Sequence, residues 1–448
     1  MEAENRRLAE AAARLPDDPP LPGHQFGPRL ISLAVNLGRT VGLRGAERTL
    51  QIVFDWFGVP QKIPDCTSIR IWMQRVGIAA LQAPVEEADD WAWMSDHSNQ
   101  IGPDKVLVVL GVRASHLPPP GTPLKHEDMR LLAAQPGTRW KREDVAEVYQ
   151  ELAERCGPPR AVVSDGAVEL REPAACLNQG RSDTITLYDL KHKAAKLLEK
   201  ELARDTRFAE FNTKLGQTRA AIQQTELAHL TPPGQKQKAR FMNLDRYLEW
   251  GSAVLWLLEH PEARARRWTT PQRLEEKLGW LRSFAGDLAA WRECQQAIAA
   301  GLTLINEQGL FHGAARHLRA AVTGLTHAVS RRLAARLLCF VRDAERQLKP
   351  GERLPMSTEI LESSFALYKQ LERQHAKGGY TSLLPVFGAL LAPATPHSIR
   401  KAFASVSVKD VKEWVRNNLG DTFTLKRQQT YREYRKYTRS ATKLATVT

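Results

Sequence analysis

The sequence predicts an α/β core with a mixed sheet, interrupted by a large all-helical insertion and preceded by a small helical domain. Three observations support this fold class. Short apolar runs typical of strands appear between residues 91 and 189, with helical patterns between them. Residues 201–350 have almost no strand signal and repeat apolar residues at helical spacing instead. A chain of 448 residues is also too long for one small core, so we expect several domains.

The predicted sheet begins with a hairpin. The segment WAWMSDHSNQI (91–101), a turn at GPDK, and VLVVLGVRA (106–114) predict two antiparallel strands, the second of them buried. A helix is expected at 142–156, followed by a short strand in RAVVSDG. The strand DTITLYD then leads into the helix LKHKAAKLLEKELARD. We therefore assign the first part of the core to residues 83–200.

The core is expected to resume after the insertion. Breaks at TPPGQKQK and HPEARARRWTTP divide the helices of residues 201–350. A strong helical pattern, STEILESSFALYKQLERQHAKGG, returns within residues 351–395, and its final glycines are a typical helix stop. Residues 396–448 are predicted to form a basic helical tail, because they end in LKRQQTYREYRKYTRSATK.

The N-terminal part of the chain is expected to hold a flexible arm and a helical domain. Residues 1–27 contain the Pro/Gly stretch PDDPPLPGHQFGP, and residues 28–82 are helical in pattern. The second helix starts at Thr67, after the turn GVPQKIPDC. Two helices joined by such a turn suit a helix-turn-helix DNA-binding domain, with a plain helical hairpin as the alternative. The residues expected to face the DNA major groove are Ser68, Arg70, Gln74 and Arg75.

Charge indicates the kind of partner. The formal net charge of +14 predicts attraction to a polyanion, with nucleic acid favoured over an anionic membrane surface. No apolar run reaches the roughly 18 residues needed to cross a bilayer, and the first residues have no signal-peptide core. We therefore expect a cytoplasmic protein. The five cysteines are scattered, without metal-ligand spacing, which argues against a zinc site.

Three acids occupy positions suited to phosphodiester chemistry. Asp96 lies within the first strand, Asp165 ends the short buried strand before Gly166, and Glu362 lies in the first turns of a strong helix. Breaking a phosphodiester bond requires charge stabilisation on the attacking and leaving oxygens. Two Mg²⁺ ions about 3.5–4 Å apart provide it when carboxylates on rigid elements hold them. The three acids are therefore candidate ligands of two Mg²⁺ ions, for which Mn²⁺ is expected to substitute.

The order of these acids, strand Asp, later strand Asp and helix Glu, resembles the ribonuclease H-like catalytic domain of DDE transposases and retroviral integrases. WAWMSDHSNQIGPDKVLVVLGV, AVVSDGAVELR with ITLYDLKHKAA, and STEILESSFALYKQ are similar to the three acid-bearing regions of a group of bacterial insertion-sequence transposases. The resemblance covers residues 85–200 and 350–380. It implies an enzyme of the bacterial nucleoid that binds terminal inverted repeats and target DNA, cleaves and joins DNA, and works as a dimer or higher oligomer.

The third acid has a rival. In many bacterial members a basic residue follows the Glu by seven positions, and Lys369 stands there relative to Glu362. Two helical turns leave the pair roughly 20° apart, so Lys369 is expected to hold a DNA phosphate beside the acids. Glu359 is offset from Lys369 by roughly 80°, and we therefore favour Glu362. The long separation of Asp165 from Glu362 departs from compact family members. Asp89 and Asp90 are rivals for the first acid, but they precede the strand.

Other residues are candidates for DNA contact. Trp268, beside the run RARRW, is the tryptophan of the insertion best placed to stack on a flipped base, whereas helix packing is the simpler role for its neighbours. His192 and Lys193 follow the last predicted strand, near the acids. His97 adjoins Asp96 but faces the opposite side of the strand, so a structural role is expected. The tail is expected to bind phosphates through Lys426, Arg427, Arg432, Arg435 and Lys436.

Two other functions remain open from the sequence. One is a catalytically inactive or domesticated relative that only binds DNA. Intact carboxylates argue against it, because they repel phosphate. The other is a nuclease or Holliday-type resolvase on the same fold, which strand transfer would distinguish from a transposase.

Overall fold

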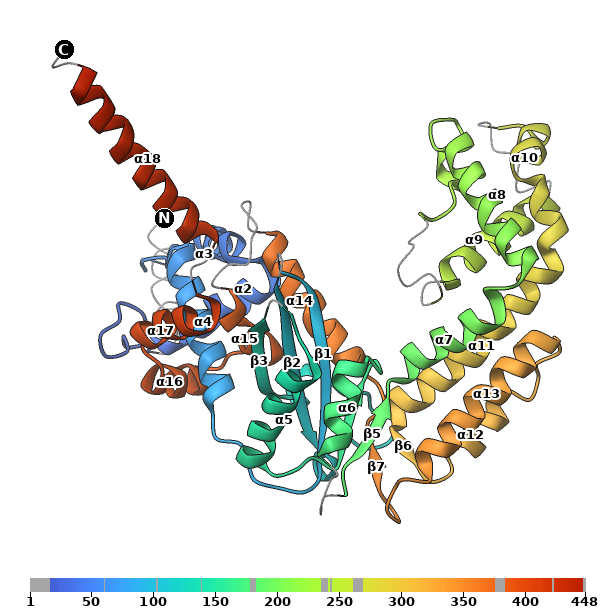
Figure 1. Cartoon of the computed structure of the whole chain (residues 1–448). Helices are drawn as coiled ribbons and strands as arrows, with labels where there is room; N and C mark the ends of the chain where they lie inside the picture. The colour runs from blue at the N-terminus through green and yellow to red at the C-terminus, as the bar shows by residue number, and fades with distance from the viewer. Residues whose placement is uncertain are drawn as a thin grey trace, which may run out of the picture.

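The computed structural model describes residues 17–59, 61–101, 104–137, 139–177, 183–234, 241, 244–260, 269–374, 383–420 and 423–445. For residues 99–101, 104, 423–425, 436 and 439–445 it describes the backbone alone. The described chain forms a crescent, with a sheet and two groups of helices around a wide hollow (Figure 1). None of its described helices is both long enough and apolar enough to cross a membrane.

A five-stranded mixed sheet lies at the centre, in the order β3-β2-β1-β4-β5. Its strands are β1 (Trp91–Ile101), β2 (Asp104–Arg113), β3 (Arg130–Gly137), β4 (Ala161–Ser164) and β5 (Ile185–Tyr188). The first three pair antiparallel, whereas β4 is parallel to β1 and β5 is parallel to β4. This arrangement confirms the predicted mixed sheet and is compatible with a ribonuclease H-like core that carries helical insertions.

Two elements of the core differ from the expectation. The sequence analysis did not predict β3, whose Pro136 lacks the N–H that a central strand would need. The strand is tolerated because it forms the edge of the sheet. The sequence analysis also did not predict α6 (Val168–Cys176), a short helix with Pro173 inside it. By contrast, α5 (Arg142–Cys156) has the predicted bounds.

The two faces of the sheet have separate cores because strand side chains alternate. Trp91 and Trp93 of β1 pack with α5 and α6 on one face. Ala92 and Met94 belong to the larger core on the other face, together with helix α14 (Glu359–Arg373). A polar residue of β1 with an even number therefore faces α14.

The N-terminal helices and the C-terminal segments form one helical body (Figure 1). It comprises α2 (Pro28–Val41), α3 (Leu43–Phe57), α4 (Cys66–Gln82), α15 (Phe387–Leu391), α16 (Pro396–Ser405) and α17 (Val408–Leu419). Helix α4 is its centre, and Gly77 lets it pass close to the turn Leu384–Val386 before α15, because a Cβ there would collide with the Pro385 carbonyl. Residues 396–419 thus pack into this body, and only α18 (Phe423–Ala445) extends from it as a separate helix.

The insertion forms a curved helical arm (Figure 1). Its helices are α7 (Leu190–Leu202), α8 (Thr206–Ile222), α9 (Leu244–Glu259), α10 (Pro271–Leu278), α11 (Ala285–Gln308), α12 (Ala314–Ala321) and α13 (Ala328–Glu345). A small ladder of β6 (Leu310–Phe311) and β7 (Arg353–Leu354) joins the arm to the segment that returns to the core. Within the described residues of 201–350, the regular elements are helical apart from β6 of this ladder.

Most tryptophans of the arm belong to its core. Trp291 is 1% exposed, and the indole N–H groups of Trp250 and Trp280 donate to the Leu230 carbonyl and the Thr218 hydroxyl. Trp256 is different: it is 53% exposed and stacks on His260. Trp268, the candidate for base stacking, lies outside the described residues.

Candidate active site

Asp96 of β1 and Asp165, the residue directly after β4, are near enough for the charge of Asp165 to raise the pKa of Asp96. In the β1–β4 ladder, Met94 pairs with Val163. Two more residues along each strand, the same register brings Asp96 opposite Asp165. Both acids continue the series of residues that faces the larger core and α14, because two residues restore the same side of a strand. The two predicted acids therefore converge at the carboxyl end of β4.

A third acid continues this row, and the sequence analysis did not identify it. In the β4–β5 ladder Ser164 pairs with Tyr188, so Asp165 is followed across the sheet by Asp189. Asp189 is fully buried and begins α7. Its carboxylate accepts hydrogen bonds from the backbone N–H of His192 at 2.7 Å and of Thr358 at 2.6 Å. It therefore joins the start of α7 to the residue that precedes α14.

Asp189 also orients His192. The Nδ1 atom of His192 lies 2.9 Å from Asp189 Oδ1, and its Nε2 atom lies 3.8 Å from Glu362 Oε1. Burial lowers the pKa of His192, but the hydrogen bond and charge of Asp189 and the charge of Glu362 outweigh it and raise the pKa. Asp189 thus holds the His192 ring with its Nε2 edge toward Glu362. The sequence analysis expected His192 near the acids but did not identify Asp189 as its partner.

Glu362 is held over the sheet by the first turns of α14. The ammonium group of Lys191 lies 2.8 Å from Glu362 Oε2 and 3.2 Å from Glu359 Oε1. Burial lowers the pKa of Lys191, but these two carboxylates raise it overall. Sequence analysis missed Lys191, although its position one residue before His192 on the same first turn was available as a signal.

Asp96 experiences the combined negative charge of the site. Burial raises its pKa, the charges of Asp165 and Glu362 raise it further, and the pKa reaches about 7. The backbone N–H of His97 donates to Asp96 Oδ1 at 2.6 Å and opposes this rise, as does the charge of His192. Glu362 is among the charges that raise the pKa of Asp96, so the favoured third acid is electrostatically coupled to Asp96.

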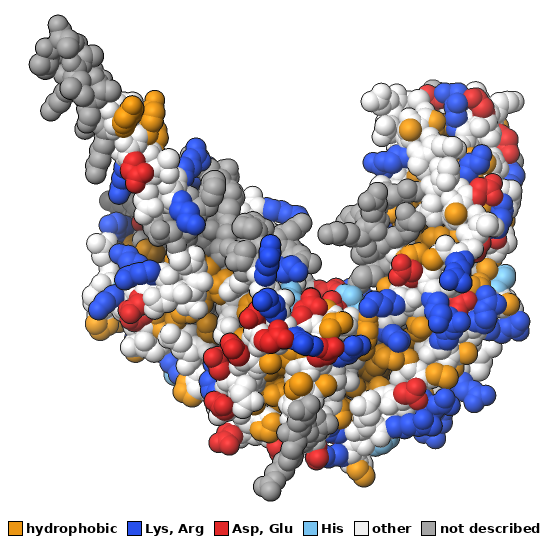
Figure 2. Space-filling model, viewed as in Figure 1, with side chains coloured by type: hydrophobic (Ala, Val, Ile, Leu, Met, Phe, Trp, Pro, Cys, Tyr) orange, Lys and Arg blue, Asp and Glu red, His pale blue; other side chains and the backbone are white. Residues whose placement is uncertain are grey.

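The described side chains do not form a preassembled metal centre. Within the described part of the chain, no three His, Cys, Asp or Glu side chains are grouped closely enough to hold an ion. Glu362 instead pairs with Lys191, beside His192. Acidic, basic and histidine side chains crowd together at the floor of the hollow, where α7 and α14 begin (Figure 2).

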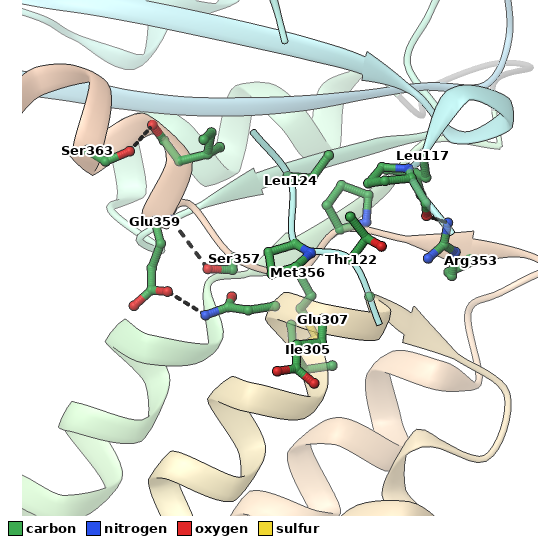
Figure 3. A pocket seen from close by; sticks show the side chains of 16 residues that line it. Leu117, Thr122, Leu124, Ile305, Glu307, Arg353, Met356, Ser357, Glu359 and Ser363 are labelled. Atoms are coloured by element: carbon green, nitrogen blue, oxygen red, sulfur yellow. Dashed lines mark hydrogen bonds between the residues drawn. The ribbon is translucent and has the colours of Figure 1, made fainter. Parts of the chain in front are cut away.

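Glu359, the rival acid, borders a separate cavity of about 270 Å³. In Figure 3 its carboxylate points toward α11, where Asn306 donates a hydrogen bond to it. The cavity is lined by apolar side chains such as Leu117, Leu124 and Ile305, and by Glu359 and Ser363 of α14. Glu359 thus faces the arm and the connection between β2 and β3.

The candidate DNA-reading residues of the N-terminal domain require a correction. Gln74 and Arg75 are only 3% and 4% exposed, so neither can face a DNA groove in this structure. Arg75 donates to the carbonyls of Val406 at 2.6 Å and Phe403 at 2.9 Å, which ties α4 to the C-terminal end of α16. The prediction failed because α4 is enclosed by helices from the distant C-terminal part of the chain.

The other two members of that set are less enclosed. Ser68 belongs to the cap of α4, since its hydroxyl donates to Asp65 Oδ2 at 3.0 Å. Arg70 is half-buried. DNA contact by Ser68 and Arg70 therefore stays a prediction. The exposed recognition helix on which it was based is not observed, because Gln74 and Arg75 of the same helix are buried.

The remaining candidates lie on three helices. Lys369 is half-buried on α14, and Lys193 is half-buried on α7. On α18, Tyr431, Tyr434 and Tyr437 are exposed, and the side chain of Lys436 lies outside the described part. The basic residues of α18 that are described and exposed are Lys426, Arg427, Arg432 and Arg435.

Two residues near Asp96 have structural roles. His97 lies on the opposite face, 5.6 Å from the ring of Trp140, and burial lowers its pKa to about 4. Asp90 pairs with Arg113 and accepts from the backbone N–H of Ser115, whereas Asp89 is exposed. These positions agree with the sequence-based preference for Asp96 as the site residue of this strand.

Comparison with known proteins identifies no family. No protein-family model matches the chain, and no curated protein matches its sequence. Among solved structures, the chain is similar to the Drosophila P element transposase strand transfer complex, with 10% sequence identity and a TM-score of 0.38. The likeness covers 83% of this chain and 92% of that chain.

Proposed function

We propose that this protein is a DNA transposase in which Asp96, Asp165 and Glu362 form the catalytic acid set. The convergence of Asp96 and Asp165 on one face of the sheet, under the charge of Glu362, carries the proposal. A buried carboxylate such as Asp96, whose pKa is raised by burial and by neighbouring acids, is costly for folding. Such clusters are typical of sites that bind a cation or transfer protons.

The donor set fits Mg²⁺, since carboxylate oxygens are the ligands this ion prefers. Bringing a divalent cation to Asp96 would offset the burial and the neighbouring negative charges that raise its pKa to about 7. Glu362 would first have to exchange Lys191 for the ion. When bound, two such ions would stabilise charge on the attacking and leaving oxygens of a phosphodiester. Mn²⁺ has similar ligand preferences and is expected to substitute.

The protein's own residues would position the DNA. Lys191, once released from Glu362, and Lys369 on the same helix as Glu362 are cations suited to phosphate oxygens. His192, held by Asp189, lies 3.8 Å from Glu362 on the side of α7 and would help to orient its carboxylate. In the proposed reaction, water first attacks the phosphodiester at the transposon end. The freed 3′-hydroxyl then attacks target DNA, so no covalent protein–DNA intermediate is needed.

The proposed partners are the terminal inverted repeats, target DNA and a second copy of the chain. Joining two transposon ends requires both to be held together, which a dimer or higher oligomer achieves. The insertion-sequence origin and the nucleoid location implied by the resemblance are part of the same proposal.

The test is cleavage and strand transfer on labelled DNA bearing the element's own ends, with Mg²⁺ or Mn²⁺. Wild type would be compared with Asp96→Ala, Asp165→Ala and Glu362→Ala, and with Glu359→Ala as the matched control from the same helix turn. We expect wild type and the Glu359 variant to nick and join DNA and the other three to be inactive.

Other outcomes would replace the proposal. Tight binding of the ends without nicking by either metal would indicate a DNA-binding protein. Cutting without joining, on branched DNA, would indicate a nuclease or resolvase. Loss of activity with Glu359→Ala but not with Glu362→Ala would move the third acid by one helical turn.

A further inference from the structure

Helix α7 carries three lysines that point along one side of the arm. Lys193 and Lys200 are seven residues apart and thus lie within roughly 20° of each other on the helix, with Lys196 roughly 60° away. Lys196 and Lys200 are exposed and Lys193 is half-buried. Within the described residues, the ion pairs of α7 are made by its other charged residues, Lys191, His192 and Glu201.

Aromatic rings fix the first two lysines beside the active site. The ammonium nitrogen of Lys193 lies 5.1 Å from the ring centre of Phe340, and both Lys193 and Lys196 lie within 5.6 Å of that of Tyr188. The Tyr188 ring in turn covers Gly166, where a Cβ would collide with it. Gly166 follows Asp165 directly, so these ammonium groups are held next to the catalytic edge of the sheet.

Helix α13 extends this basic surface. Arg332 and Arg336, one turn apart, both pair with the nearly buried carboxylate of Glu201 on α7, at 3.1 and 2.7 Å. One carboxylate between two guanidinium groups leaves a positive charge, and the two arginine side chains are 57% and 40% exposed. Burial of Glu201 makes this a fixed pair of cations rather than a mobile surface salt bridge.

We infer that these residues form a DNA-binding track, the α7–α13 strip, made of Lys193, Lys196, Lys200, Arg332 and Arg336. Its partner is the sugar–phosphate backbone of duplex DNA as it leaves the scissile phosphate. The inference rests on the proposed function, which places that phosphate at the acid row. Lys193 to Lys200 spans roughly 10.5 Å of helix axis, which matches about three phosphates of one strand at 3.4 Å each.

The position of the strip favours DNA over an acidic protein. Lysine and arginine side chains gather on the lower part of the arm, next to the mixed acidic and basic side chains at the floor of the hollow (Figure 2). Helix α13 lies on the outer side of the arm (Figure 1), so a duplex that passes from the site along the arm would meet both surfaces. Phosphate contacts position DNA without reading its sequence, so the strip is expected to act on any sequence.

The experiment compares two helices with the same spacing of basic residues. One variant of the full chain combines Lys193→Gln, Lys196→Gln and Lys200→Gln. The control combines Lys409→Gln, Lys412→Gln and Arg416→Gln, which are exposed on α17 in the other helical body and remove the same charge at the same i, i+3, i+7 spacing. Affinity for a fluorescein-labelled random-sequence duplex is measured by anisotropy from roughly 50 to 200 mM salt.

We expect the α7 variant to reduce the slope of log K against log salt by about 2–3 and to weaken binding about 10–100-fold at 0.1 M salt. The α17 control should keep the wild-type slope. Replacing the three α7 lysines by arginine should restore it, because charge rather than side-chain shape is required. The proposed DNA-binding strip would be rejected if the α7 variant kept the wild-type slope of log K against log salt, or if the α7 and α17 variants lost slope equally.

Binding and cleavage separate this inference from the proposed function. If the salt slope of DNA binding falls in the α7 variant alone, and wild type never nicks DNA, the strip is supported and the transposase proposal is rejected. An active wild type with an unaltered α7 variant would reject the strip and leave the transposase standing. Binding of the α7 surface to an acidic protein, with no DNA binding by wild type, would reject both.

Discussion

Helices α4 and α7 both carry basic residues that the sequence marks as candidates for DNA contact, yet the structure uses them differently. In α4, Arg75 is 4% exposed and its guanidinium donates to two backbone carbonyls. In α7, Lys196 and Lys200 are exposed, and Lys191 contacts a carboxylate of the candidate active site. The comparison shows that a basic residue type indicates a role only after its neighbours are known.

The physical difference is the number of surfaces that cover each helix. Helix α4 is enclosed by α2, α3, α15, α16 and α17, so its polar side chains must be satisfied inside the protein. Helix α7 packs through Leu190, Ala194 and Leu198 against the arm and the core, which leaves its other side for charged groups. Four predictions test this contrast, in order of the expected effect.

The largest effect is expected on the rate of DNA cleavage, at the acids of α14 that pair with Lys191 of α7. Glu362→Gln should lower DNA cleavage by roughly a thousandfold or more, because neutral amides hold divalent ions poorly and the charge next to Asp96 is lost. Glu359→Gln should stay within roughly tenfold of wild type, since Glu359 faces the arm. Single-turnover cleavage rates measure both. Equal losses would show that both glutamates act at the acid row.

The second effect concerns stability and pH. Because burial and neighbouring acids raise the pKa of Asp96 to about 7, its ionisation opposes folding above the ordinary carboxyl pKa. Asp96→Asn should therefore unfold at the same temperature as wild type near pH 4. At pH 8, without metal, it should unfold roughly 5 °C or more higher. Thermal melts at the two pH values measure this, and a pH-independent difference would contradict the coupled acid row.

The third effect belongs to α4. Arg75→Ala should destabilise the protein by about 2–4 kcal/mol, since two buried carbonyls lose their donor and Phe403 loses the guanidinium 3.8 Å above its ring. The matched change on α7, Lys193→Ala, should alter stability by less than about 0.5 kcal/mol. Urea unfolding measures both. If Arg75→Ala kept the wild-type stability but lost DNA affinity, the prediction that α4 contacts DNA would be supported again.

The smallest effect is expected at the residue that links β5, α7 and α14. Asp189→Asn should lower the pKa of His192, because the charge that raises it is removed. Loss of this support should also reduce cleavage about 10–100-fold, the range seen when the partner of a site residue is removed. NMR titration of the His192 ring checks the first result, with His97 on the opposite face as an internal reference. An unmoved His192 pKa would assign Asp189 a purely structural role.

Much of the sheet could be predicted from the sequence. The hairpin of β1 and β2, helix α5 and the two short parallel strands follow from apolar runs and turn residues that act over a few positions. Strand β3 escaped prediction because Pro136 and Gly137 are unfavourable in strands, and only its place at the sheet edge makes them acceptable. Helix α6 escaped for a similar reason, since Pro173 interrupts its pattern.

The candidate site was predictable in its acids but not in their partners. Asp96 and Asp165 each stand at a recognisable place on a strand, and Glu362 on a recognisable helix. Asp189 gave no comparable signal, because an acid before a helix is usually only a cap. Its importance comes from Thr358, 169 residues later, because the Asp189 carboxylate accepts a hydrogen bond from the backbone N–H of Thr358.

By itself, the sequence determined the alternation of strands and helices, the basic character of the chain and the residue types of the acid row. These properties depend on local backbone preferences and on composition. The tertiary structure alone decided that Asp96, Asp165 and Glu362 share one face, that Lys191 pairs with Glu362 and that Arg75 is buried. Those outcomes depend on contacts between segments far apart in the chain, because burial and electrostatic coupling follow distance in space and not distance in sequence.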